Sequence, residues 1–313
     1  MRDPLLLALL ALTGCIEPPP PRTLVVHAGA QRVVVQDGTI TAIAPDTEAT
    51  LPLVAGAVTI DAQALTLCPG HVEVATAPSE LASVRAAVSW VAAELARGVT
   101  TLAVLDTELD KALALRRYVG TGRHRGPRIF VSGPRLVATA GPLLQTSGRR
   151  ALRTVAEARL AVQDLAEAQV DVIRLEVATA ADAVVACAAL VEARVQEVRV
   201  IAVGGSALGL RCEGAEPPSF VCSLWGSDGD FDGCPVDLFS RSAVNAHALG
   251  LDDALGQVRV GFRADLVAVV SDSGTSGATQ PPPSWVMLDG VVQHLGGPAW
   301  YAALVLTISR WLP

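Results

Sequence analysis

Both ends of this chain carry the pattern of a β-hairpin, which constrains how its first and last segments fold. Residues 33–43 alternate between apolar and polar side chains around Asp37-Gly38, and residues 285–292 repeat the arrangement around Asp289-Gly290. An Asp-Gly pair between alternating strands favours a tight type I′ turn. Two distant hairpins of the same kind predict one small β-sandwich built from both ends of the chain.

Between the hairpins, strand patterns alternate with helix patterns. Residues 99–105 form an unbroken apolar and β-branched run, as in a strand buried on both faces, and apolar residues at helical spacing precede it over 81–95. Thr154 and Glu157 form a capping box that opens another predicted helix. This alternation predicts an α/β fold with parallel strands, a (β/α) TIM-like barrel. Further buried strands are predicted over residues 128–132, 170–177 and 198–203.

The segment available for the barrel is short. Eight strand–helix units need at least about 200 residues, and residues 67–249 offer fewer. After Gly205 the sequence also loses clear helical periodicity until Leu249. We therefore expect an incomplete barrel, closed by short irregular segments if it closes.

The N-terminus has the features of a bacterial export signal. Leu5 to Leu12 form an apolar core after Arg2, and Leu12-Thr13-Gly14-Cys15 resembles a lipobox, although a plain signal peptide is the alternative. Cleavage before Cys15 and its lipidation would anchor the protein to the cell envelope through the membrane. The predicted divisions are a lipoprotein signal peptide (1–14), a proline-rich tether (15–22), a composite β-sandwich (23–66 and 258–296), a barrel (67–257) and an apolar C-terminal helix (297–313).

Composition limits the partners. The chain is 51% hydrophobic and 18% charged, which is typical of a globular protein, and its net charge of −7 argues against binding to nucleic acid. The C-terminal helix is too short to span a bilayer, so it packs against the body or contacts the membrane interface.

The six cysteines fit an exported protein, where disulfides form. Cys68 and Cys187 lie in apolar runs and are predicted to be packed thiols. We expect one disulfide among Cys212, Cys222 and Cys234, and the sequence leaves the pair open. A metal site formed by these three cysteines lacks the usual Cys-x-x-Cys spacing.

Several motifs together resemble the amidohydrolase superfamily, in particular its imidazolonepropionase-like and prolidase-like branch. The resemblance extends over most of the chain after residue 22, and its most specific part is the pair of segments 248–253 and 261–267. Fold alone does not establish function. The other matching segments are residues 36–43, 60–62, 69–73, 96–101, 126–133 and 170–174.

The resemblance implies a metal-dependent hydrolase of C–N bonds, but this sequence departs from the implied ligands. The family's first-strand His-x-His falls on Ala75 and Ala77, and its carboxylated fourth-strand lysine falls on Arg174. Methyl groups offer no donor atoms, and a guanidinium stays protonated and forms no carbamate. The only lysine, Lys111, lies in a helical pattern. Zinc or another divalent metal is implied only if the chain is active, and otherwise no cofactor is expected.

A few acidic and imidazole side chains could still carry chemistry. Asp228 matches the family's last-strand aspartate, and His71 with Glu73 lies on one face of the first predicted strand. Asp228, Asp230 and Asp232 alternate before Gly233, and with Asp237 they form a candidate calcium loop, although a polar surface turn is the simpler interpretation. His27, His124, His247 and His294 are expected to be satisfied or solvated.

Two functional hypotheses follow. The first is a catalytically degenerate lipoprotein that binds a small-molecule ligand or a protein partner at the former active site. The second is an active hydrolase of C–N bonds that uses an altered metal site around His71, Glu73, Arg174 and Asp228. The first is favoured because changes around a metal cannot replace several lost ligands.

Overall fold

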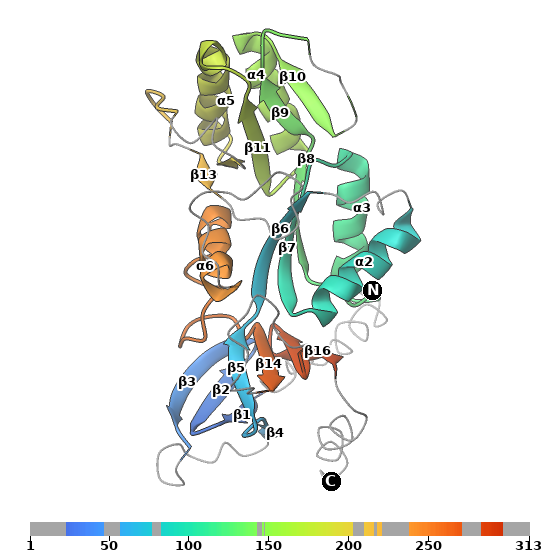
Figure 1. The fold of residues 1–313 in the computed structure, drawn as a ribbon, viewed down its shortest axis with the longest axis vertical. Coiled ribbons are helices and arrows are strands. Elements are labelled where there is room, and N and C mark those ends of the chain that lie inside the picture. The colour runs from blue at the N-terminus through green and yellow to red at the C-terminus, as the bar shows by residue number, and fades with distance from the viewer. Residues whose placement is uncertain are drawn as a thin grey trace, which may run out of the picture.

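The computed structural model describes residues 23–46, 57–76, 83–142, 146, 148–202, 210–215, 218–220, 238–270 and 283–296. Within these ranges, two antiparallel-rich sheets lie at one end of the molecule, and parallel strands with helices beside them extend away from that end (Figure 1). The helices are α2 (Val84–Ala96), α3 (Leu109–Gly120), α4 (Val155–Glu167), α5 (Ala183–Val195), α6 (Leu238–Leu249) and the short 3-10 helix η2 (Ala180–Asp182).

The two sheets at that end contain strands from the first and the last described segments of the chain, and these strands share one hydrophobic core. One sheet has the order β3-β2-β1-β4 and the other β16-β15-β14-β5. Val26, Val35 and Ile40 of the first sheet share a hydrophobic cluster with Leu266 and Met287 of the second. The strands are β1 (Thr23–Ala28), β2 (Gln31–Gln36), β3 (Thr39–Pro45), β4 (Val58–Asp61), β5 (Leu65–Pro69), β14 (Leu266–Val270), β15 (Trp285–Leu288) and β16 (Val291–Leu295).

Both predicted hairpins are confirmed. Strands β2 and β3 pair antiparallel around Asp37 and Gly38, whose φ angles are 48° and 79°, and β15 and β16 pair around Asp289 and Gly290, at 49° and 75°. A side chain on Gly38 would lie 2.8 Å from the carbonyl oxygen of Asp289, so the two turns touch. Glycine is required there by both its positive φ and the close approach.

The remaining described strands form the parallel part of the fold. One sheet has the order β6-β7-β8, and the other β10-β9-β11-β12-β13. Only Pro134 separates β8 from β9, and Gly133, the last residue of β8, has a φ of 68°. The strands are β6 (His71–Thr76), β7 (Val99–Leu105), β8 (Arg128–Gly133), β9 (Arg135–Ala138), β10 (Arg149–Leu152), β11 (Val172–Val177), β12 (Arg199–Ala202) and β13 (Ser219–Phe220).

The helices cover these strands as the alternating pattern predicts. Leu102, Val131 and Leu175 belong to a core cluster with residues of α2, α3, α4 and α5. The predicted strand at 99–105 is β7 itself, and all of its residues are buried. The predicted capping box is confirmed in part. The Thr154 hydroxyl accepts a hydrogen bond of 3.1 Å from the backbone N–H of Glu157, but the Glu157 carboxylate accepts from the backbone N–H of Arg153 (2.8 Å) rather than of Thr154.

Helix α6 lies along the edge of β6 that is not paired with β7. The backbone N–H of Val72 donates to Ser242 Oγ (3.3 Å), and Asn245 Nδ2 donates to the carbonyl oxygen of Val72 (3.0 Å). Ala246 and Leu249 of α6 also pack in one cluster with Val72. These contacts satisfy a buried strand edge that would otherwise lack hydrogen-bond partners.

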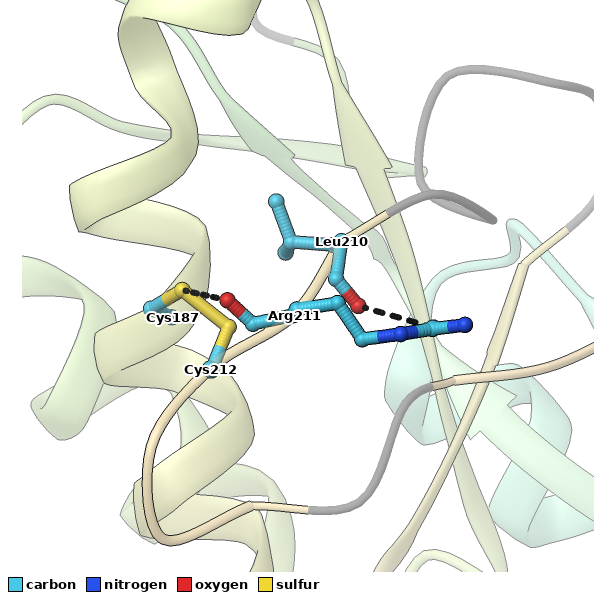
Figure 2. The surroundings of a disulfide bond; sticks show 4 residues. All are labelled: Cys187, Leu210, Arg211 and Cys212. Carbon is cyan, nitrogen blue, oxygen red and sulfur yellow. Dashed lines mark hydrogen bonds between the residues drawn. A yellow bond between two sulfur atoms is a disulfide. The ribbon is translucent and has the colours of Figure 1, made fainter.

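The cysteine prediction was wrong in part. Cys187 on α5, which was predicted to be a packed thiol, forms a disulfide with Cys212 in the segment 210–215 (Figure 2). Cys212 was expected to pair, if at all, with Cys222 or Cys234. A helix side chain in an apolar run gives no sign of a bond to a residue 25 positions later. Cys68 is a buried free thiol, as predicted, and burial raises its pKa.

Several predictions concern residues outside the described ranges. They are the signal peptide and tether with Cys15, the ligand position Ala77, the possible calcium loop of Asp228, Asp230, Asp232 and Asp237, the cysteines Cys222 and Cys234, and the C-terminal helix at 297–313. None of the described helices combines the length and apolar character needed to cross a membrane.

Candidate functional site

Four charged side chains meet at the carboxyl ends of the central parallel strands. Asp106 follows the last residue of β7, Arg135 opens β9 directly after β8, and Arg174 and Glu176 lie on β11. Because parallel strands end at the same edge of a sheet, residues far apart in the sequence are brought together there. We call these four residues the ion-pair cluster.

One oxygen of Asp106 receives most of the hydrogen bonds in the ion-pair cluster. Arg135 Nε and Nη2 lie 3.1 and 2.5 Å from Asp106 Oδ2, and Arg174 Nη1 also donates to this oxygen. Arg135 Nη1 donates to Glu176 Oε2 at 2.6 Å. Asp106 Oδ1 is buried and has no hydrogen-bond partner among the described residues. The carboxylate is therefore held from one side by guanidinium groups.

The side chains of the ion-pair cluster are largely buried, so water screens the interactions between their charges only weakly. The side chain of Arg174 is 2% exposed, those of Arg135 and Asp106 are 11% exposed, and that of Glu176 is 35% exposed. Burial alone would lower the pKa of Arg135, but the hydrogen bonds and charges of Asp106 and then Glu176 outweigh burial and raise it. The Arg135 guanidinium therefore stays charged at every physiological pH.

The backbone at Asp106 is in a conformation that few residues adopt. Its φ is 54°, in the left-handed region, which aspartate tolerates better than most side chains. A side chain on Gly148 would lie 2.4 Å from the carbonyl oxygen of Asp106, so the chain packs tightly around this residue. Such conformations persist only where surrounding contacts enforce them.

The residues of the ion-pair cluster do not fit a divalent metal. A metal site needs carboxylate, imidazole or thiolate donors, whereas Arg174 occupies the position that the sequence resemblance assigns to a bridging lysine. Asp106 Oδ2 already accepts N–H groups from Arg135 and Arg174, and these positive charges repel a cation. Within the part of the chain that the structure describes, no three or more His, Cys, Asp or Glu side chains are grouped so as to hold a metal ion.

The sequence candidates His71 and Glu73 lie elsewhere on the sheet. Both are buried on β6, and His71 pairs with Val99 at the first position of β7. Asp106 follows the last position of β7, so the level of His71 on the sheet and Asp106 are seven residues apart along that strand, about 23 Å at ~3.3 Å per residue. Ala75 lies near the end of β6, whereas Asp228 is outside the described residues.

The other described histidines have ordinary roles. His27 Nδ1 lies 2.7 Å from Asp46 Oδ2, and that hydrogen bond, followed by those of Arg32, lowers the pKa of Asp46. His124 stacks on Tyr118, and the exposed His247 contacts Asp252 at 3.1 Å. Burial, followed by the charge of Arg125, lowers the pKa of His294. These contacts agree with the expectation of satisfied or solvated side chains.

Sequence reasoning predicted that Arg174 occupies a lost ligand position but did not predict its partners. Asp106 was recognisable in principle, because it directly follows the predicted strand at 99–105 and strand ends carry functional residues. Arg135 and Glu176 gave no such signal, since an arginine after a Gly-Pro turn and a glutamate within a strand are both common on surfaces.

Comparison with known proteins identifies relatives by structure only. No protein-family model and no curated protein sequence matches the chain. A prolidase solved with N-methylphosphonate-L-proline has a TM-score of 0.65 and 17% identity, covering 88% of this chain and 100% of the prolidase. An ochratoxinase from A. niger has a TM-score of 0.66 and 15% identity, covering 87% and 95% of the two chains.

A third solved structure, of molinate hydrolase, has a TM-score of 0.64 and 14% identity, and the match covers 94% of this chain and 98% of that enzyme. Another similar structure is described as an amidohydrolase. At these identities the likeness concerns the fold. The chain therefore shares the mixed α/β fold of these solved structures, among them an amidohydrolase, which is the fold that its sequence motifs implied.

Proposed function

We propose that this protein is a catalytically degenerate member of the amidohydrolase fold, which binds a ligand or a partner protein rather than hydrolysing a C–N bond. The observation that carries the proposal is the buried contact of Arg174 and Arg135 with Asp106. This contact fills the carboxyl ends of the strands, where enzymes of barrel folds place their reactive groups, with mutually neutralising charges.

The fold relatives support hydrolysis of C–N bonds as the ancestral activity, since the similar structures include a prolidase and an ochratoxinase. We infer that the parallel strands are an incomplete (β/α) barrel and that the two other sheets form a β-sandwich. The inference is supported by α6, because Ser242 and Asn245 hydrogen-bond to the edge of β6 where a complete barrel would have a further strand.

The second candidate is a hydrolase with an altered divalent-metal site around His71, Glu73, Arg174 and Asp228. The hydrolase descriptions of the similar structures favour it. One observation argues against a single site that contains both His71 and Arg174. His71 lies beside the first residue of β7, whereas Arg174 hydrogen-bonds to Asp106, which follows the last residue of β7.

Metal retention separates the two candidates. We expect protein incubated with Zn²⁺ or Mn²⁺ and then desalted to keep well under one equivalent of metal, measured by elemental analysis, because guanidinium groups replace donor atoms at the strand ends. The comparison variant is Ala75→His with Ala77→His, which restores the imidazoles implied by the resemblance and should retain more zinc. Stoichiometric metal in the unmodified protein, with amide hydrolysis that a chelator abolishes, would establish the enzyme instead.

We also propose that the protein is exported and anchored in the bacterial envelope by a lipid on Cys15. The disulfide between Cys187 and Cys212 supports export, because such bonds persist mainly in oxidising compartments. Replacing Cys15 by serine should abolish incorporation of a labelled fatty acid, because serine has no thiol to accept the lipid. Continued labelling of the Cys15→Ser protein would refute lipidation at this residue.

A further inference from the structure

An exposed group of arginines lies where α3 leads into β8. Arg117, Arg123 and Arg125 are exposed, and they form no ion pair with any carboxylate among the described residues. Tyr118 stacks on His124 with ring centroids 4.5 Å apart, which brings the end of α3 against the loop that follows it. We call these five residues the arginine turn.

The arginines of the arginine turn differ in their ion pairing from the other basic side chains of α3. On the same helix, Lys111 Nζ lies 2.8 Å from Glu108, and Arg116 Nη1 lies 2.9 Å from Asp171. In a chain with a net charge of −7, acidic partners are abundant, so three exposed arginines without them form a local positive surface. Such a surface attracts a polyanionic partner.

A series of contacts connects the arginine turn with Thr23, the first residue of the described fold. Thr23 pairs with Gln36, next to the turn in which Gly38 touches Asp289. Both carboxylate oxygens of Asp289 lie 2.9 Å from Arg128 Nη2, and Arg128 is separated from Arg125 by only two residues. The predicted tether therefore joins the fold on the side that carries the arginine turn.

We propose that the arginine turn contacts the headgroups of anionic phospholipids and thereby orients the protein on the membrane. The orientation rests on the proposed lipid anchor at Cys15. At ~3.1 Å per residue, the proline-rich tether of residues 15–22 would span about 25 Å, which keeps this end of the fold close to the lipid surface. The aromatic ring of Tyr118, 44% exposed, suits the boundary between headgroups and water.

The strength of this contact can be estimated from its charges. A basic residue near an anionic membrane contributes about fivefold to the partition coefficient, equivalent to ~1 kcal/mol. Three arginines alone would bind the membrane weakly. Together with a lipid anchor they provide a second source of membrane affinity. Because the whole protein is acidic, any preference for anionic over neutral vesicles has to arise from a local cationic surface.

The test uses full-length Cys15→Ser protein and compares its binding to phosphatidylcholine vesicles with its binding to vesicles that also contain phosphatidylglycerol. The two kinds of vesicle differ in headgroup charge, so the ratio of the two partition coefficients reports on charge. Changing Arg123→Gln and Arg125→Gln together should reduce this ratio by about 25-fold, and added salt should reduce it in the parent protein.

The matched control is Arg153→Gln with Arg211→Gln, which removes the same charge from two exposed arginines, one directly after β10 and one in the segment 210–215 that the disulfide joins to α5. It should leave the ratio unchanged. Equal binding of the parent protein to both vesicles, or equal losses in the two double variants, would overturn the proposal. Arginine-dependent binding to polyglutamate without binding to vesicles would also overturn it and indicate an acidic protein partner. Because the protein tested lacks the lipidated cysteine, failure of the anchor and failure of this surface are distinguishable.

Discussion

Replacing Asp106 by alanine is expected to lower the free energy of unfolding by about 3–5 kcal/mol, because it removes the carboxylate that two buried guanidinium groups share. Arg174 is 2% exposed and Arg135 11% exposed, so water cannot replace the lost partner. Urea denaturation followed by circular dichroism measures the change. Asp106→Asn should also destabilise, and because asparagine tolerates positive φ, it separates the loss of charge from backbone strain.

The matched control is the exposed ion pair of Arg150 and Asp164. Its two groups lie 2.7 Å apart, but their side chains are 34% and 48% exposed. Asp164→Ala should therefore change the free energy of unfolding by less than about 1 kcal/mol. If Asp106→Ala lowered the free energy of unfolding by no more than this control, the ion-pair cluster would not be the buried, mutually stabilising group of charges on which the proposed function rests.

Local patterns predicted the regular elements of the fold well. The hairpin at Asp289-Gly290, the strand β7 and the cap at Thr154 each depend on residues within a few positions of one another. In those cases turn chemistry, alternation and capping act in the same short segment, and the packed structure has no reason to override them.

The ion-pair cluster depends instead on contacts between distant segments. Asp106 and Arg174 are 68 residues apart, and Asp106 and Arg135 are 29 apart. The resemblance to a family predicts that Arg174 stands at a ligand position, but it could not reveal what the guanidinium binds. Pairing between charged side chains depends on strand order and register, which the sequence of one chain leaves undetermined.

The contact of α6 with β6 was equally hidden. Ser242 and Asn245 lie on α6, in a segment where the sequence showed no clear helical periodicity and no helix was predicted. Both are buried and hydrogen-bond to the backbone of Val72. Sequence counting predicted that the barrel lacks strand–helix units. It could not predict that a helix would meet the hydrogen-bonding groups at the edge of its first strand.

Removing the disulfide is the other change expected to have a large effect. The bond between Cys187 and Cys212 closes a loop with a sequence separation of 25 residues. In the chain-entropy account, a loop of this length stabilises the folded state by about 3.5 kcal/mol relative to the reduced chain. Besides the disulfide, Arg194 Nη1 donates to the carbonyl oxygen of Gly214 at 2.9 Å, which holds the same segment.

The prediction is that Cys187→Ser with Cys212→Ser lowers the free energy of unfolding by about 3–4 kcal/mol in urea denaturation. Dithiothreitol should destabilise the parent protein and a Cys68→Ala variant, since Cys68 is a free thiol, but should leave the double variant nearly unchanged. If dithiothreitol still destabilised the double variant, a disulfide outside the described residues would be responsible. If the double variant were as stable as the parent, the cross-link would contribute nothing and would no longer support export to an oxidising compartment.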